Sequence, residues 1–224
     1  MDEPTPLDYE RVEPRKAHGL RFIHYVLIVI VALLVASIFV PSGGHSRRQA
    51  NQIKCASNLR QIGQGIQLYA QANLGFFPPD LQTLAATQPL GLSVMICPST
   101  SDQTPANIGA ISAAGRCSYI YVGANLTSKA DPSCILALED PANHNLEGGN
   151  ILFADGHVEF FVLPEFQFFL NELNAGRNPP STQTPALSKA AAEQDYQKNW
   201  KSRMPQLKSG VWRIPTTQPS TTPQ

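Results

Sequence analysis

The most extended hydrophobic stretch of the chain lies near its N-terminus. Residues 22–40 read FIHYVLIVIVALLVASIFV, with no Asp, Glu, Lys or Arg. These nineteen residues would cover about 28 Å as a helix at ~1.5 Å per residue, close to the roughly 30 Å hydrocarbon core of a bilayer. The pattern therefore predicts a transmembrane helix at 20–41. A buried core helix is the alternative, but such helices usually carry polar residues on one face.

Basic residues lie on both sides of this stretch and orient it only weakly. Those at 15–21 are closer to the apolar residues than Arg47 and Arg48 are, which favours a cytoplasmic N-terminus. A secretory signal cut near 42–44 is the alternative, but the apolar stretch exceeds the ~7–15 residues of a usual signal. We expect a single-pass protein of the inner (cytoplasmic) membrane, in contact with membrane lipid, with a periplasmic or other extracytoplasmic head.

A second helical pattern follows the predicted membrane segment. Apolar residues recur there at steps of three and four, between polar and basic ones: Ile53, Ala56, Leu59, Ile62, Ile66 and Tyr69. This spacing predicts an amphipathic helix that ends near Gly75. The segment 76–79, which reads FFPP, forces an extended turn. Asp80 is then placed to cap a short helix that contains Leu81 and Leu84.

Four short runs rich in aromatic and β-branched residues predict strands, at 118–122, 134–138, 150–154 and 157–162. Asp155-Gly156 joins the last two and predicts a type I′ hairpin, in which both central residues have positive φ. A closing helix begins at Pro164 and ends at Gly176. The expected fold is α+β and pilin-like, with a long N-terminal helix, half transmembrane and half amphipathic, packed on a small antiparallel sheet.

The C-terminal part of the chain is rich in Pro, Ser, Thr and Gln from Asn178 onward. Its apolar residues, Leu187, Tyr196, Trp200 and Trp212, are too sparse to offset the entropy lost on ordering. We expect a disordered tail at 178–224, although 187–201 is compatible with a polar helix. The chain would then divide into a cytoplasmic leader-like segment at 1–19, a transmembrane helix at 20–41, an amphipathic helix plus head at 42–177, and the tail.

The charges of the 224-residue chain are balanced, with 17 Lys and Arg against 17 Asp and Glu. No overall field would attract a phosphate backbone, so nucleic acid is not an expected partner. The sequence contains no Gly-x-Ser-x-Gly, Walker, His-Glu-x-x-His or Gly-x-Gly-x-x-Gly motif. We therefore expect no enzyme, with no catalytic residues and no bound cofactor.

Four cysteines occur at positions 55, 97, 117 and 134. They form no Cys-x-x-Cys pair and have no histidine at zinc-finger spacing, which argues against a structural zinc site. In an oxidising compartment we expect a disulfide between Cys97 and Cys117, which flank one loop. The alternative, that all four are small buried or free thiols, is equally compatible with the spacing.

Acidic residues and histidines gather around the predicted hairpin, where Glu139, Asp140, His144, Glu147, Asp155 and His157 fall within nineteen residues. The candidate metal ligands among them are Asp140, His144, Glu147, Asp155 and His157. Their carboxylates suit calcium and their histidines suit zinc. No helical His-x-x-x-His or EF-hand spacing is present. We therefore prefer a structural role, in which Asp155 serves the turn and His144 bonds a loop backbone.

Four features follow one another between Gly19 and Phe161: the apolar helix, CASNLRQIGQGIQLYAQ continuing into GFFPP, Cys97-Pro98-Ser99, and GGNILFADGHVEFF. In this order they resemble the pseudopilin-like, prepilin-type proteins of type II secretion in planctomycete-type bacteria, which end in a His-x9-Asp-Gly motif. The matching motif residues are His144, Asp155 and Gly156. Ten residues separate His144 from Asp155 here, where the family has nine.

The resemblance implies cleavage after Gly19, so that Leu20 becomes the N-terminus. The family carries a glutamate at the fifth mature position, where this chain has His24. The implied function is that of an assembly or scaffold component of a type II secretion or pilus-like system, with sister pseudopilins or secretion-system proteins as partners. The missing glutamate favours an alternative, a membrane-tethered extracytoplasmic binding module that does not polymerise.

Overall fold

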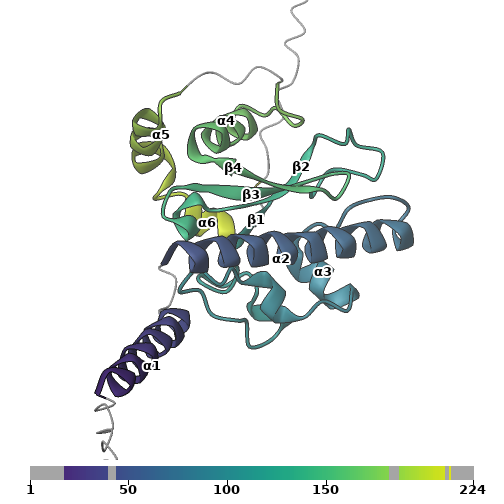
Figure 1. Ribbon diagram of the computed structural model, residues 1–224. Helices are drawn as coiled ribbons and strands as arrows, with labels where there is room; N and C mark the ends of the chain where they lie inside the picture. Colours follow the sequence, from purple (N-terminus) through teal and green to yellow (C-terminus); the bar gives the residue numbers. More distant parts are fainter. Residues whose placement is uncertain (1–17, 40–43, 182–186, 210–211, 213–224) are drawn as a thin grey trace, which may run out of the picture. The chain divides into compact units, whose positions relative to one another are not determined.

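The computed structural model describes residues 18–39, 44–181, 187–209 and 212, and the chain divides into two compact units, Met1–Gly43 and Gly44–Gln224 (Figure 1). In the first unit the described element is helix α1 (His18–Phe39). Its described side chains, at 22–35, are all exposed. Gly19 and Leu20 lie in the first turn of α1, where side chains are outside the described residues, so the predicted cleavage stays a prediction.

Within the residues that the structure describes, no helix is both long enough and apolar enough to cross a membrane. This finding corrects the prediction of a transmembrane helix at 20–41. It also corrects two expectations built on that helix, the pilin-like architecture with a transmembrane half and the single-pass inner-membrane location with a periplasmic head.

The second unit is built on a four-stranded antiparallel sheet in the order β1-β2-β3-β4. The strands are β1 (Tyr119–Tyr121), β2 (Ile135–Glu139), β3 (Gly148–Phe153) and β4 (Val158–Val162). They lie within one or two residues of the predicted strands. The α+β content and the small antiparallel sheet are therefore confirmed for this unit.

Helix α2 (Gly44–Ala72) covers one face of this sheet, together with α3 (Leu81–Thr87) and the 3₁₀ turns η1 (Leu92–Met95) and η2 (Ile108–Ala110) (Figure 1). The fully buried residues of α2 include Cys55, Leu59, Ile62 and Ile66, at steps of four and three. Ile53, which we expected on this face, is 69% exposed. As predicted, Asp80 caps α3 by accepting a hydrogen bond from the Thr83 amide at 2.6 Å.

The opposite face of the sheet is covered by α4 (Leu163–Asn174), α5 (Lys189–Asp195) and the π-helical turn η4 (Tyr196–Trp200) (Figure 1). Helix α6 (Met204–Lys208) lies against β1, and its Met204 joins the same apolar cluster. Tyr196, Trp200, Met204 and Trp212 are all buried here, and the two tryptophan rings lie 5.5 Å apart. The expected disordered tail is therefore corrected over 187–209 and at Trp212. Its few large apolar residues are spaced so that most of them reach one cluster.

The hairpin between β3 and β4 is confirmed, but its turn differs from the predicted type I′. Gly156 has φ +90°, whereas Asp155 is not among the described residues with positive φ. The Gly156 amide donates to the Phe153 carbonyl at 2.9 Å. The Asp155 carboxylate accepts from the His157 amide at 3.0 Å. This turn needs only one glycine-like position, because the aspartate side chain closes the other half of the loop.

Candidate functional site

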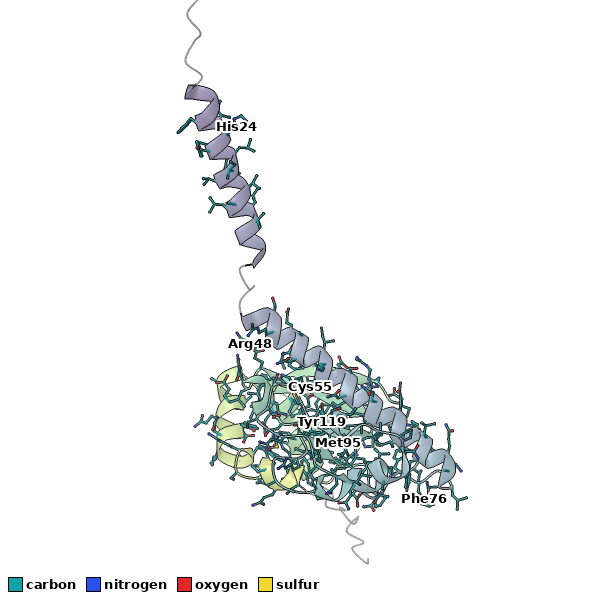
Figure 2. The ribbon with its side chains drawn as sticks, turned by 90° about the horizontal axis from the view of Figure 1, so that it is seen from below. His24, Arg48, Cys55, Phe76, Met95 and Tyr119 are labelled. Carbon is teal, nitrogen blue, oxygen red and sulfur yellow. A yellow bond between two sulfur atoms is a disulfide. The ribbon has the colours of Figure 1, made fainter. Side chains whose placement is uncertain are left out.

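A disulfide joins α2 to the loop after η1, on the inner face of α2. It pairs Cys55 with Cys97, whose Cα atoms are 5.2 Å apart. Both residues are fully buried. Cys117, the expected partner of Cys97, is a buried free thiol, and burial raises its pKa to about 11. Figure 2 shows Cys55 and Arg48 on α2, with Tyr119 and Met95 in the body against which the helix packs.

The last residue of β2, Glu139, points to the same buried region. Side chains alternate along a strand, and because Leu138 joins the cluster under α4, Glu139 faces α2. Its carboxylate is fully buried. Tyr119 lies opposite Glu139 in the register of β1 and β2. Burial first, and then the charge of Glu139, raises the pKa of the Tyr119 hydroxyl, so this phenol stays protonated beside the carboxylate.

His144 reaches the same point from the loop that follows β2. That loop is the 3₁₀ turn η3 (Pro141–His144), and Asp140 caps it by accepting from the Ala142 amide at 2.9 Å. Asn145 ends the turn in the left-handed region, with φ 54°. The turn brings His144 Nε2 to 2.7 Å from Glu139 Oε2, with 2% and 0% of the two side chains exposed.

The donor atoms of Cys55, Cys97, Glu139 and His144 all lie within 4.8 Å of one another. We call these four residues the Cys-Glu-His cluster. His144 Nε2 is 3.8 Å from Cys97 Sγ. The side-chain amide of Asn150 on β3 donates to Glu139 Oε2 at 3.2 Å. Glu139 Oε1 is buried and has no hydrogen-bond partner within the described part of the chain.

The cluster does not have the geometry of a cysteine-histidine-carboxylate catalytic triad. In a triad one imidazole nitrogen faces the nucleophile and the other faces the carboxylate. Here the same atom, His144 Nε2, is closest to both Cys97 Sγ and Glu139 Oε2. Atoms that converge on one point suit the coordination of a single ion better than the passage of a proton along a line.

A pocket of about 260 Å³ lies next to the cluster. Its lining includes His144, together with Gln52, Pro98, Asn143 and Glu147. Glu147 forms an ion pair with Arg48 at 2.9 Å and accepts from Gln52 at 3.4 Å. Because these two pairs connect α2 to the turn between η3 and β3, they hold one wall of the pocket.

The predicted metal ligands are largely separated in the structure. Of the five predicted ligands, only His144 belongs to the Cys-Glu-His cluster in the described residues. Asp140 accepts from the Tyr196 hydroxyl and lies 3.6 Å from Lys208 Nζ, so it anchors the C-terminal segment. Asp155 and His157 form an ion pair at the exposed tip of the hairpin. Desolvation acts to raise the pKa of Asp155, but hydrogen bonds from the backbone and side chain of His157, together with the charge of its ring, lower this pKa overall. In the described residues these five side chains form no common donor group.

Cys55, Cys97 and Glu139 are the cluster residues that we did not predict as ligands. Cys55 carried a usable signal, since it precedes Leu59, Ile62 and Ile66 at the same helical spacing. Glu139 carried another, because a carboxylate ends an otherwise apolar strand, ILALE. Neither signal identifies its partners, since Cys55 and Cys97 lie 42 positions apart in the sequence.

The surface of α1 is a second candidate functional feature. All twelve large apolar residues exposed between Phe22 and Val35 have 42–70% of their surface accessible. The stretch contains one histidine, His24, and no Asp, Glu, Lys or Arg. The helix is therefore apolar around its whole circumference over this length.

Comparison with known proteins finds no relative of this chain. No family model matches it, and no curated protein or solved structure matches it either. The resemblance to pseudopilin-like proteins thus stays a prediction from the residues quoted above. The comparisons lend no support to a pseudopilin or a secretion-system component.

Proposed function

We propose that this chain is a non-enzymatic assembly protein, in which α1 packs against the α1 helices of further copies of the chain. The observation that carries the proposal is the exposed apolar surface of α1 between residues 22 and 35. A helix that is apolar all round is normally buried. Each Val, Leu, Ile or Phe side chain gains ~1.5–3 kcal/mol on full burial, so several such contacts suffice for association.

The spacing of residues on α1 supports a second copy as its partner. Phe22, Val26, Val29 and Leu33 follow one another at steps of four, three and four, which is the spacing of a coiled-coil seam. The described side chains include no carboxylate, ammonium or guanidinium group that would repel an identical helix. Because neighbouring positions are apolar too, contacts form on more than one side, and a bundle of more than two helices is expected.

The second unit would be the part that the assembly displays. It buries its own apolar residues on both faces of the sheet, in two clusters. Since its core is complete without α1, association through α1 leaves this unit intact. The proposed mechanism is therefore packing through one helix, with the α+β unit carried on it.

Sedimentation velocity of the full-length protein tests this function. We expect the wild-type chain to sediment as an oligomer and Val29→Asp/Leu33→Asp to sediment as a monomer, because an unpaired carboxylate in a helix seam costs several kcal/mol. The matched control is Ile53→Asp/Leu68→Asp, which charges two exposed apolar residues of α2, 69% and 50% accessible. It should assemble like the wild type.

Two outcomes would contradict the proposal: a monomeric wild-type chain and an α1 variant that assembles normally. If the monomeric wild-type chain is also retained by phospholipid vesicles, a partner other than the protein itself covers α1.

A further inference from the structure

We propose that the Cys-Glu-His cluster is a four-ligand Zn²⁺ site, and that the Cys55–Cys97 disulfide is the metal-free, oxidised state of the same residues. The ligand atoms would be the two cysteine Sγ atoms, His144 Nε2 and one carboxylate oxygen of Glu139. Two sulfurs, one imidazole and one carboxylate are a donor set that Zn²⁺ accepts in preference to Ca²⁺ or Mg²⁺, which take oxygen ligands.

The distances fit this coordination. Tetrahedral Zn²⁺ with bonds of ~2.3 Å to sulfur and ~2.0–2.1 Å to nitrogen holds these two ligand atoms about 3.6 Å apart. Cys97 Sγ and His144 Nε2 are 3.8 Å apart. The same geometry places the nitrogen and the carboxylate oxygen about 3.4 Å apart, against 2.7 Å here. Small side-chain rotations and the separation of the two sulfurs therefore open a place for the ion.

The polar atoms around the cluster are arranged as a cation requires. Glu139 Oε1 is fully buried and unpaired within the described residues, which is a costly arrangement for a carboxylate. Asn150 donates to the other oxygen and so fixes the carboxylate in place, as residues around metal ligands commonly do. Bound Zn²⁺ would compensate the charge of the Glu139 carboxylate.

Reduction of the disulfide converts the oxidised state into the metal-binding one. A dithiol reductant attacks the Cys55–Cys97 bond, is itself oxidised to a cyclic disulfide, and leaves two cysteine thiols. Zn²⁺ then displaces the two thiol protons to solvent and binds both thiolates. Either state connects α2 to the loop after η1, so the fold keeps this link whether the cysteines are oxidised or bound to metal.

The adjoining pocket gives the ion a route to the cluster. It is lined by His144, Pro98 and Glu147, so one ligand and the neighbour of another lie on its wall. Once bound, the ion would have four protein ligands and no open position for substrate. That is the arrangement of a structural rather than a catalytic zinc site.

Metal retention by the full-length protein tests the proposal. The chain is reduced with a dithiol, incubated with Zn²⁺ without oxygen and separated from free metal. We expect about one Zn²⁺ per chain in the reduced protein, and loss of this Zn²⁺ in the oxidised protein and in Cys97→Ser. The matched control is Cys134→Ser, which removes a buried free cysteine outside the cluster and should retain the metal.

Two further measurements keep the test decisive if a cysteine variant folds poorly. Co²⁺ added to the reduced wild-type chain should give thiolate-to-cobalt charge-transfer absorption, which needs no substitution. Glu139→Gln, which preserves the shape of the side chain, should weaken Zn²⁺ binding at least ~10-fold. Absence of Zn²⁺ and of the cobalt band from the reduced wild-type chain overturns the proposal, as does wild-type Zn²⁺ affinity in Glu139→Gln. The result does not depend on whether α1 self-associates.

Discussion

Glu139 Oε2 accepts from the Asn150 side-chain amide at 3.2 Å, and the same amide nitrogen lies 3.3 Å from the Gln52 carbonyl of α2. Asn150 thus connects the centre of the sheet both to the buried carboxylate and to the long helix. Since a buried carboxylate without partners is strongly destabilising, the cluster depends on this amide.

Asn150→Ala should therefore destabilise the protein. We expect a loss of ~1–3 kcal/mol in the free energy of unfolding, because the buried Glu139 carboxylate and the Gln52 carbonyl each lose one hydrogen-bond donor. Chemical denaturation followed by tryptophan fluorescence measures it. Gln61→Ala, on the exposed side of α2, should change the same quantity by less than ~0.5 kcal/mol. Equal effects from the two substitutions would show that the Asn150 hydrogen bonds do not stabilise the protein.

Trp200→Ala should release the C-terminal segment from the sheet. Trp200 is 2% exposed, packs beside Trp212 and has the Arg203 guanidinium 4.6 Å from its ring centre. We expect a loss of ~3–5 kcal/mol for this large-to-small change and faster proteolysis within 187–209. Glu193→Gln, in an exposed ion pair with Lys189, is the control. Unchanged proteolysis of the Trp200 variant would mean that the segment is held by other contacts.

The pH dependence of stability should include a contribution from Glu172 at acid pH. The hydrogen bond from Arg177 lowers the pKa of this carboxyl from 4.5 to about 2. A folded-state pKa below the unfolded value gives stability that is present above about 4.5 and is lost as the pH falls toward about 2. The Glu172→Gln variant should therefore lose less stability than the wild type across this window. Parallel curves from denaturation at several pH values would contradict the assignment.

Gly148 is the position on β3 where a side chain is least tolerable. Its φ is +149°, and an added Cβ would lie 2.0 Å from the Phe161 carbonyl oxygen. We expect Gly148→Ala to cost ~2–4 kcal/mol through strain and the displaced strand. Gly91→Ala is the control, because there the nearest atom is 3.7 Å from the added Cβ and φ is ordinary. Thermal unfolding of both variants measures the difference, and similar melting temperatures would contradict it.

Local patterns predicted much of the second unit. The strands, the Asp80 cap and the helix after Pro164 depend on residues close in sequence, and all were placed within a few positions. The register of α2 was less certain, because Ile53 looked like a core residue while Cys55 did not. Spacing from Leu59 backward would have favoured Cys55.

The cluster could not be predicted because its members come from four segments. Cys55 and Cys97 lie on α2 and the loop after η1, while Glu139 and His144 lie on β2 and η3. The sequence shows only that Glu139 and His144 are close to each other along the chain. It makes four further residues equally good candidate ligands: Asp140, Glu147, Asp155 and His157. Long-range packing of the sheet against α2 decides which of these converge. The C-terminal segment was mispredicted similarly, since composition does not show that Trp200 and Trp212 meet.

X-ray absorption at the zinc edge tests the zinc site most directly. The sample is the reduced full-length chain loaded with Zn²⁺, with the metal-retaining variant Cys134→Ser as the comparison. The account predicts two sulfur neighbours at ~2.3 Å and two nitrogen or oxygen neighbours at ~2.0–2.2 Å in both proteins. A shell of nitrogen and oxygen alone in the wild-type chain would contradict it.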